Sequence, residues 1–174
     1  RQFAGDEPFA VLYGDDVVLG PVSATGELCA AYEEYGLGVV GIQPVQLSEI
    51  GRYCTLAVKE LADGRFAVSD MIEKPKPEQV LSPYAILGRC LLTPEIFPIL
   101  ENTPPGAGGE LQLTDAMRTL ARTKGMIGVQ YSSKRYDMGN KLGILQATVE
   151  VAAAHPDVGP QFLAYLKEFL QNQP

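Results

Sequence analysis

The residues best suited to chemistry are an adjacent acid and base, Glu73 and Lys74, which end a β-type run before Pro75. A glutamate carboxylate can accept hydrogen bonds from two neighbouring sugar hydroxyls, and a lysine ammonium is a compact charge suited to a phosphate oxygen. Consecutive side chains of a strand point to opposite faces, so both reach one ligand only if the strand ends or twists here. Pro75, which cannot donate to a ladder, favours such an ending. The pair fits a sugar phosphate, and a solvated ion pair is the alternative.

Two further carboxylates, Asp15 and Asp16, follow an apolar run at residues 9–13. A nearly continuous apolar run is typical of a strand buried on both faces. Carboxylates after such a strand lie where open α/β sheets bind ligands. Asp15 could ligate Mg²⁺, which prefers oxygen donors and often takes only one or two protein carboxylates beside substrate phosphates. Ordinary turn chemistry explains the Asp-Asp pair equally well.

A proline- and glycine-rich loop at residues 104–109 opens onto Glu110 and an expected helix through Lys124. Such a loop can hold an anion on free backbone N–H groups, or it can be a simple connector. It matches neither a Walker A loop nor a dinucleotide-binding fingerprint. The single histidine, His155, has no serine or cysteine motif near it, so we interpret it as a helix-end residue and find no support for a hydrolytic triad.

Composition narrows the class of protein. With 174 residues and 46% hydrophobic content, the chain can bury one sizeable core and is expected to form one domain. Its net charge is −7 and it has no basic block, so nucleic acid is not an expected partner. Cys29, Cys54 and Cys90 are odd in number and far apart, without CxxC spacing, so neither a disulfide framework nor a zinc site is indicated and a reducing cytoplasm is expected. No apolar run approaches membrane-spanning length, so no membrane is expected.

The elements that position these residues follow from hydrophobic periodicity and from capping residues. Ser23 is the expected N-cap of a helix through Tyr35, with Gly36 after it. Other helices are expected from Thr93, over 110–124, and over the C-terminal stretches 141–154 and 158–171, which could pack on their own sheet or on another subunit. Strands are expected at 38–45, 53–58, 66–73 and 85–92, with 127–131 as the last, and a hairpin turn at 62–65. The opening residues 1–6 are typical of the last turn of a helix, so we expect the sequence to start inside a larger protein.

Five motifs, taken together, carry a resemblance to a known family. They are FAVLYGDD (9–16), MIEKP (71–75), AILGR (85–89), PGAGGELQLTD (105–115) and RYDMGNK (135–141). In this order they resemble the bacterial UTP–glucose-1-phosphate uridylyltransferases, which make UDP-glucose. The similarity extends over essentially the whole chain. The residues of the last two motifs disfavour a thymidylyltransferase.

The resemblance implies an α/β fold, namely a partial three-layer, Rossmann-like nucleotidyltransferase fold with a mixed sheet and helices. The family's GxGTR-type segment, which holds UTP, does not occur here, so the nucleotide-binding N-terminal part is expected to be absent. Residues 1–174 would form a single, incomplete domain, the sugar-phosphate half with the C-terminal helices. By the same likeness Asp15 and Asp137 would bind Mg²⁺, Glu73 would hold the glucose hydroxyls, and Lys74 would meet the phosphate of glucose 1-phosphate. The sugar side would be lined by Gly108, Gly109 and Glu110.

In the implied reaction, glucose 1-phosphate attacks the α-phosphorus of UTP in line and pyrophosphate leaves. Catalysis would depend on holding two anions together and neutralising them with Mg²⁺ and Lys74, without a covalent intermediate. We expect these residues alone to be inactive because UTP lacks its site. An exposed edge at residues 9–13 should favour a homo-oligomer. The alternative function is a truncated, non-catalytic module for sugar-phosphate binding or oligomerisation.

Three positions depart from the family's pattern. Cys54 follows Tyr53 where the family usually has a glycine in the sugar pocket, so its side chain is expected to affect sugar binding. Pro83 and Tyr84 replace an Asn-Leu pair, and Asn140 replaces an aspartate beside the expected metal site.

Overall fold

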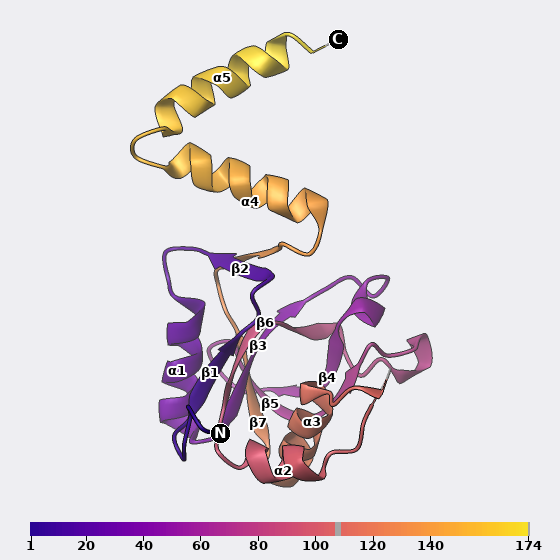
Figure 1. Cartoon of the computed structure of the whole chain (residues 1–174). Helices are drawn as coiled ribbons and strands as arrows, with labels where there is room; N and C mark the ends of the chain where they lie inside the picture. The colour runs from indigo at the N-terminus through magenta and orange to yellow at the C-terminus, as the bar shows by residue number, and fades with distance from the viewer. Residues whose placement is uncertain (107–108, 174) are drawn as a thin grey trace.

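The computed structural model describes residues 1–106 and 109–173. A six-stranded mixed sheet, with strand order β1-β6-β3-β7-β5-β4, forms its centre (Figure 1). β3 and β7 pair in parallel, and the other neighbours pair antiparallel. β4 also meets β6 at Thr55 and Ala85, so the sheet curls back on itself. The six strands are β1 (Phe9–Leu12), β3 (Gly38–Pro44), β4 (Cys54–Glu60), β5 (Arg65–Glu73), β6 (Tyr84–Leu92) and β7 (Met126–Gln130).

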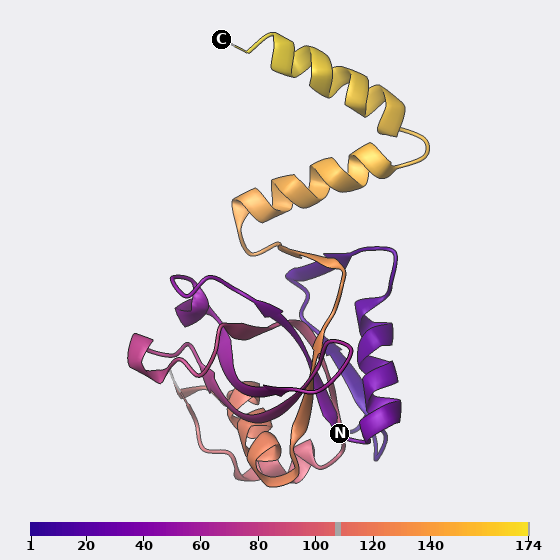
Figure 2. The same cartoon turned by 180° about the vertical axis from the view of Figure 1, so that it is seen from behind.

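Helices cover both faces of this sheet, which confirms the three-layer α/β fold. α1 (Ala24–Tyr35) places Leu28 and Ala31 against one face. α2 (Ile96–Asn102) and α3 (Leu113–Lys124) cover the other face, where Met117 and Leu120 join the larger core cluster. Figures 1 and 2 show the two sides of this arrangement. Two short 3₁₀ turns, η1 (Ile50–Arg52) and η2 (Pro77–Gln79), lie in the loops that border β4 and follow β5.

Capping residues set several boundaries as expected. The Ser23 hydroxyl accepts a hydrogen bond from the Gly26 N–H at 3.1 Å, and Gly36 ends α1 with a left-handed φ of 65°. The hairpin turn between β4 and β5 is confirmed by their antiparallel pairing. Two helix starts were predicted too early, because Gln112 is extended and α3 begins only at Leu113. The helix expected from Thr93 likewise begins at Ile96, after a turn.

The prediction that residues 9–13 form a strand buried on both faces is wrong. β1 is an edge strand that pairs with β6. Phe9 stacks on Phe97 with ring centroids 5.3 Å apart, whereas the side chain of Leu12, which points to the opposite side, is 55% exposed. The apolar run therefore marks a strand whose outer edge and one face have no cover within the described chain.

The expectation that residues 127–131 form the last strand is also wrong. β8 (Lys134–Asp137) follows β7 and pairs antiparallel with β2 (Asp16–Leu19), with Asp16 opposite Asp137. β8 is largely charged or polar, and β2 has only three consecutive apolar residues, so both fall short of the longer apolar or alternating runs from which strands are predicted. This ribbon lies beside the central sheet and brings two distant parts of the chain together.

The C-terminal helices form a hairpin that projects from the sheet, as Figures 1 and 2 show from opposite sides. α4 (Lys141–Ala154) has the predicted boundaries, and α5 is Gly159–Gln171. The Asn140 side chain accepts hydrogen bonds from the N–H groups of Leu142 and Gly143 and caps α4. The departure at Asn140 therefore keeps a good capping residue while it removes a charge. α4 rests on β8 and α5 instead of on the central sheet.

Candidate functional site

A cleft of about 420 Å³ opens where the β2–β8 ribbon, the ends of β4 and β5, the middle of β6 and the first turn of α3 meet. Four carboxylates and two guanidinium groups line it. These charged residues are Asp15, Asp16, Glu73, Asp137, Arg52 and Arg135. Three of the residues selected from the sequence for metal or sugar binding, Asp15, Glu73 and Asp137, are therefore brought to one place.

The ribbon positions the two carboxylates expected to bind Mg²⁺. Asp15 immediately precedes β2 and Asp137 ends β8, and the Met138 N–H donates to the Asp15 carbonyl at 2.7 Å. Both side chains face Gly139. A Cβ placed on that glycine would lie 3.1 Å from Asp137 Oδ1 and 3.7 Å from Asp15 Oδ2. The Gly139 N–H holds Asp137 Oδ1 at 2.9 Å, so the two carboxylates converge.

The donor set at this point suits Mg²⁺. It consists of two hard carboxylate oxygens, and Mg²⁺ usually keeps water and substrate phosphates as its other ligands. Within residues 1–106 and 109–173, no group of three or more His, Cys, Asp and Glu side chains could hold a metal by itself. The residues present therefore fit a magnesium ion whose coordination a substrate completes, and they do not resemble a closed, protein-only site.

Glu73 and Cys54 face each other across the β4–β5 ladder, at the floor of the cleft. Burial raises the pKa of Glu73, and the neighbouring Lys74 opposes that shift. Thr114, in the first turn of α3, lies beside the same carboxyl. Cys54 is only 4% exposed, and burial keeps its thiol pKa well above the ordinary range. The cysteine thus contributes a neutral wall that packs into the core and also borders the cleft.

Lys74 shows how β5 ends. Its φ of 44° is left-handed, which is rare for a residue other than glycine, and its N–H donates to the Tyr53 carbonyl at 3.0 Å. This turn ends the strand directly after Glu73, as the following proline predicted. The Lys74 side chain is exposed and lies outside the cleft lining, so its contact with a phosphate stays a prediction.

Two of the three residues before α3 that were expected to line the sugar site lie outside the lining of the cleft. Gly109 and Glu110 are exposed and do not line the cleft. Gly108 lies outside the described residues. Lining from this region comes instead from Gln112, Leu113 and Thr114, a few positions later in the same motif.

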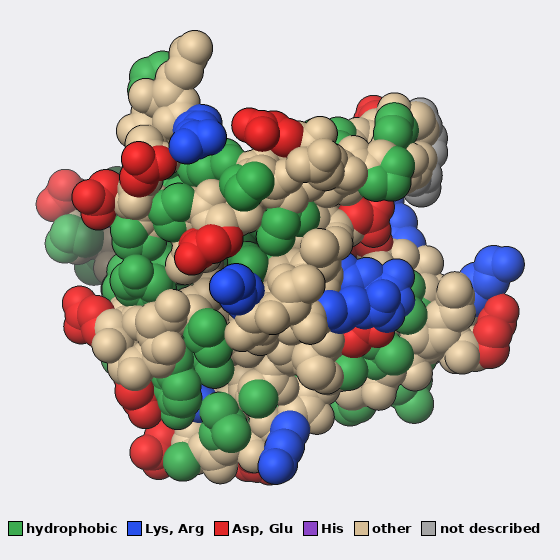
Figure 3. All heavy atoms as spheres, turned by 90° about the horizontal axis from the view of Figure 1, so that it is seen from below, with side chains coloured by type: hydrophobic (Ala, Val, Ile, Leu, Met, Phe, Trp, Pro, Cys, Tyr) green, Lys and Arg blue, Asp and Glu red, His purple; other side chains and the backbone are tan. Residues whose placement is uncertain are grey.

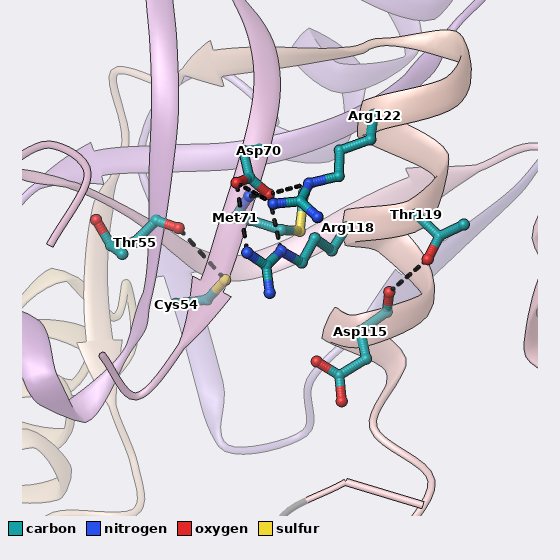
Figure 4. A network of polar contacts seen from close by, with 8 residues as sticks. All are labelled: Cys54, Thr55, Asp70, Met71, Asp115, Arg118, Thr119 and Arg122. Atoms are coloured by element: carbon teal, nitrogen blue, oxygen red, sulfur yellow. Dashed lines mark hydrogen bonds and ion pairs between the residues drawn. The ribbon is translucent and has the colours of Figure 1, made fainter. Parts of the chain in front are cut away.

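A charged clamp fixes the strand that carries Glu73 to the helix that carries Thr114 (Figure 4). Asp70 on β5 accepts hydrogen bonds from Arg118 at 2.8 and 3.4 Å and from Arg122 at 2.9 and 2.7 Å. Burial alone would raise the pKa of Asp70, but these bonds outweigh it and hold the pKa below its usual range. Bidentate pairs of this kind restrict geometry as well as add energy. The clamp therefore sets the spacing between two walls of the cleft.

Sequence reasoning missed the cations of the cleft. Arg135 is hydrogen-bonded to Asp16, and its guanidinium carbon lies 5.5 Å from the centroid of the Tyr53 ring. Arg52 approaches the same ring at 5.7 Å. Arg135 is part of the RYD motif and could have been found there. Arg52 lies in a 3₁₀ turn with no pattern of its own, so no sequence signal marked it.

Comparison with known proteins gives this geometry a context. No family model matches the chain. A UTP–glucose-1-phosphate uridylyltransferase of Bacillus subtilis is 37% identical over 173 residues, which are 99% of this chain and 58% of that protein. The uridylyltransferase of Staphylococcus epidermidis is 40% identical over 168 residues, with 97% and 58% covered.

Solved structures agree with these relatives. A UDP-glucose pyrophosphorylase in complex with UDP-glucose superposes with a TM-score of 0.80 at 35% identity, covering 96% of this chain and 59% of that one. A UTP-bound enzyme from Acinetobacter baumannii gives 0.84 at 25% identity, with 99% and 59% covered. The fold is thus that of the sugar nucleotidyltransferases among these solved structures. Over its own length, the chain is homologous to the UTP–glucose-1-phosphate uridylyltransferases. It spans about 58% of the length of the curated relatives it matches.

Two remaining expectations concern other partners. In the described part of the chain, no helix has the length and apolar character needed to cross a membrane. The face shown in Figure 3 carries basic side chains in small groups beside acidic ones and not as a continuous stripe. The absence of a nucleic-acid partner stays a prediction from composition.

Proposed function

We propose that this chain supplies the glucose 1-phosphate site of a UTP–glucose-1-phosphate uridylyltransferase, which transfers UMP from UTP to glucose 1-phosphate and releases pyrophosphate. The observation that carries the proposal is the convergence of Asp15, Asp137 and Glu73 on one cleft, although they are far apart in the sequence. The reaction is inferred from the homologous uridylyltransferases. The cleft provides a carboxylate that can accept hydrogen bonds from sugar hydroxyls, next to two carboxylates that can ligate a metal ion.

Each residue has a role that suits its surroundings. Glu73 accepts hydrogen bonds from glucose hydroxyls, while Asp15 and Asp137 would hold Mg²⁺. When bound, Mg²⁺ neutralises negative charge on the phosphates. Lys74, at the left-handed end of β5, adds a positive charge for the sugar phosphate. Because the chemistry is an in-line displacement between two anions, positioning and charge neutralisation are the main demands on the protein.

Calorimetric titration of the chain with glucose 1-phosphate, with and without Mg²⁺, tests this proposal. We expect binding that strengthens with Mg²⁺ and is lost in Glu73→Gln. Asp137→Asn should remove the Mg²⁺ effect, because it deletes one of the two donors. Glu101→Gln, a change on the exposed end of α2, is the matched control. If glucose 1-phosphate fails to bind the unchanged chain, or binds equally well to Glu73→Gln, the proposal is wrong.

The proposal also covers the cellular compartment and the oligomeric state. The described cysteines are unpaired, which fits the reducing cytoplasm expected of a sugar-nucleotide enzyme. We infer a homo-oligomer, because the edge of β1 is uncovered and apolar residues of the α4–α5 hairpin are exposed, among them Leu142 and Leu170, at 62% and 70%. Light scattering at micromolar concentration tests this, and a clean monomer would contradict it.

A further inference from the structure

Two guanidinium groups share one carboxylate of the cleft. Arg52 Nη2 lies 3.9 Å and Arg135 Nη2 lies 4.0 Å from Asp137 Oδ2. Both distances exceed the range of a hydrogen bond, so each cation attracts Asp137 without binding it directly. Tyr53 interacts with both groups, at 5.7 Å and 5.5 Å from its ring centroid, and a cation over an aromatic face is attracted to it. The tyrosine ring therefore lies close to both cations.

The two arginines differ in how firmly they are held. The Arg135 side chain is 14% exposed and is hydrogen-bonded to Asp16, which is itself 10% exposed. The Arg52 side chain is 56% exposed and extends from η1. Its second acidic neighbour is Glu49 Oε1 at 3.8 Å, another ion pair too long for a hydrogen bond. Arg135 is thus a fixed part of the cleft wall. Arg52 makes no direct hydrogen bond to Asp137 or Glu49, so its side chain can turn without breaking one.

The net negative charge of the cleft suggests a role for Arg52 in binding phosphate. Its lining carries four carboxylates and two arginines, so an incoming phosphate meets an excess of negative charge. A divalent cation bound between Asp15 and Asp137 would neutralise that excess. It would also weaken the electrostatic attraction that holds Arg52 beside Asp137. A guanidinium released in this way presents a donor fork that matches phosphate oxygens.

We propose that Arg52 is a phosphate-binding residue which, without ligand, stands in electrostatically for the metal beside Asp137 and turns to the sugar phosphate when Mg²⁺ binds. This inference rests on the proposed function, since it requires that the cleft bind Mg²⁺ and a sugar phosphate. It assigns opposite effects to one side chain: Arg52 competes with Mg²⁺ and assists the phosphate.

Titrations of the chain with Mg²⁺ alone, and with glucose 1-phosphate at saturating Mg²⁺, separate these effects. Arg52→Gln should bind Mg²⁺ about two- to fivefold more tightly, because an exposed opposing charge has left Asp137. The same variant should bind glucose 1-phosphate about tenfold more weakly, because a charge-assisted hydrogen bond is lost. Arg52→Lys keeps the charge and loses the fork, so its Mg²⁺ affinity should match the unchanged chain while its phosphate affinity falls.

Lys167→Gln on the exposed side of α5 makes the same change in net charge away from the cleft and should alter neither affinity. Opposite shifts in Arg52→Gln support the inference. A loss of both affinities would indicate a merely structural role and overturn it, as would two unchanged affinities in a chain that otherwise binds both ligands. If the unchanged chain binds neither Mg²⁺ nor glucose 1-phosphate, this inference and the proposed function fall together.

Discussion

Replacing Asp70 by asparagine should loosen the clamp between β5 and α3. The carboxylate accepts two hydrogen bonds each from Arg118 and Arg122, and its side chain is 21% exposed. Exposed ion pairs contribute about 0.2–1 kcal/mol, and breaking a buried pair costs about 3–5 kcal/mol. Since Arg118 is 33% and Arg122 is 53% exposed, solvent screening reduces the cost of losing both pairs to about 2 kcal/mol.

Urea denaturation of the chain at pH 7 measures this cost. Asp70→Asn should lower the free energy of unfolding by about 2 kcal/mol, which corresponds to about 4–8 °C in melting temperature for a chain of this size. Asp6→Asn is the matched control, because Asp6 meets Arg1 through a single 3.4 Å contact and both side chains are largely exposed. That variant should change stability by less than about 0.5 kcal/mol.

The stability cost of Asp70→Asn should depend on pH. The pKa of Asp70 in the folded chain is depressed, so its stabilisation is present above the unfolded pKa, taken as 3.8, and is lost as the pH falls toward the folded value. The difference between the unchanged chain and Asp70→Asn should therefore shrink below about pH 4. A difference that stays constant to pH 2, or a cost at pH 7 no larger than that of Asp6→Asn, would refute the clamp.

Three further substitutions probe the cleft and the packing of α4 beside it. Cys54→Gly should tighten binding of glucose 1-phosphate, because the cysteine borders the cleft opposite Glu73; an unchanged dissociation constant would show that the thiol serves only the core. Glu73→Gln should raise the melting temperature above pH 4.5, where burial penalises the charged carboxylate, and give no gain below it, as thermal scans at pH 4 and pH 8 would show. Gly143→Ala should cost about 1–3 kcal/mol in urea unfolding, since its Cβ would lie 2.1 Å from the Asp137 carbonyl oxygen, whereas Gly14→Ala, with open space around it, should not.

Local signals in the sequence predicted the helices well. Ser23 and Gly36 bound α1, and the stretch from Lys141 to Ala154 has the boundaries expected of it, because capping depends on one or two neighbouring residues. Starts without a capping side chain were misplaced, as at Glu110, where three residues outside any helix or strand precede α3. The apolar run of β1 predicted a strand buried on both faces, because such a run does not show which neighbours cover it; only the expected absence of the N-terminal part suggested an exposed edge.

The site was predictable where chemistry follows from residue type. Glu73, Asp15 and Asp137 were selected from their motifs, and the structure brings them to one cleft. The β2–β8 ribbon that joins the two aspartates was missed, since its strands have only four residues each and are too short for a periodic signal. Arg52 was missed for a related reason, because its position depends on Asp137, 85 places later in the chain.

The most direct measurement is a crystal structure of the chain with glucose 1-phosphate and Mg²⁺. Our account predicts glucose hydroxyls within hydrogen-bond distance of the Glu73 carboxylate, and one metal ion shared by Asp15 and Asp137 beside Gly139. A sugar phosphate bound away from Glu73, or aspartates too far apart to share an ion in its presence, would contradict the central claim.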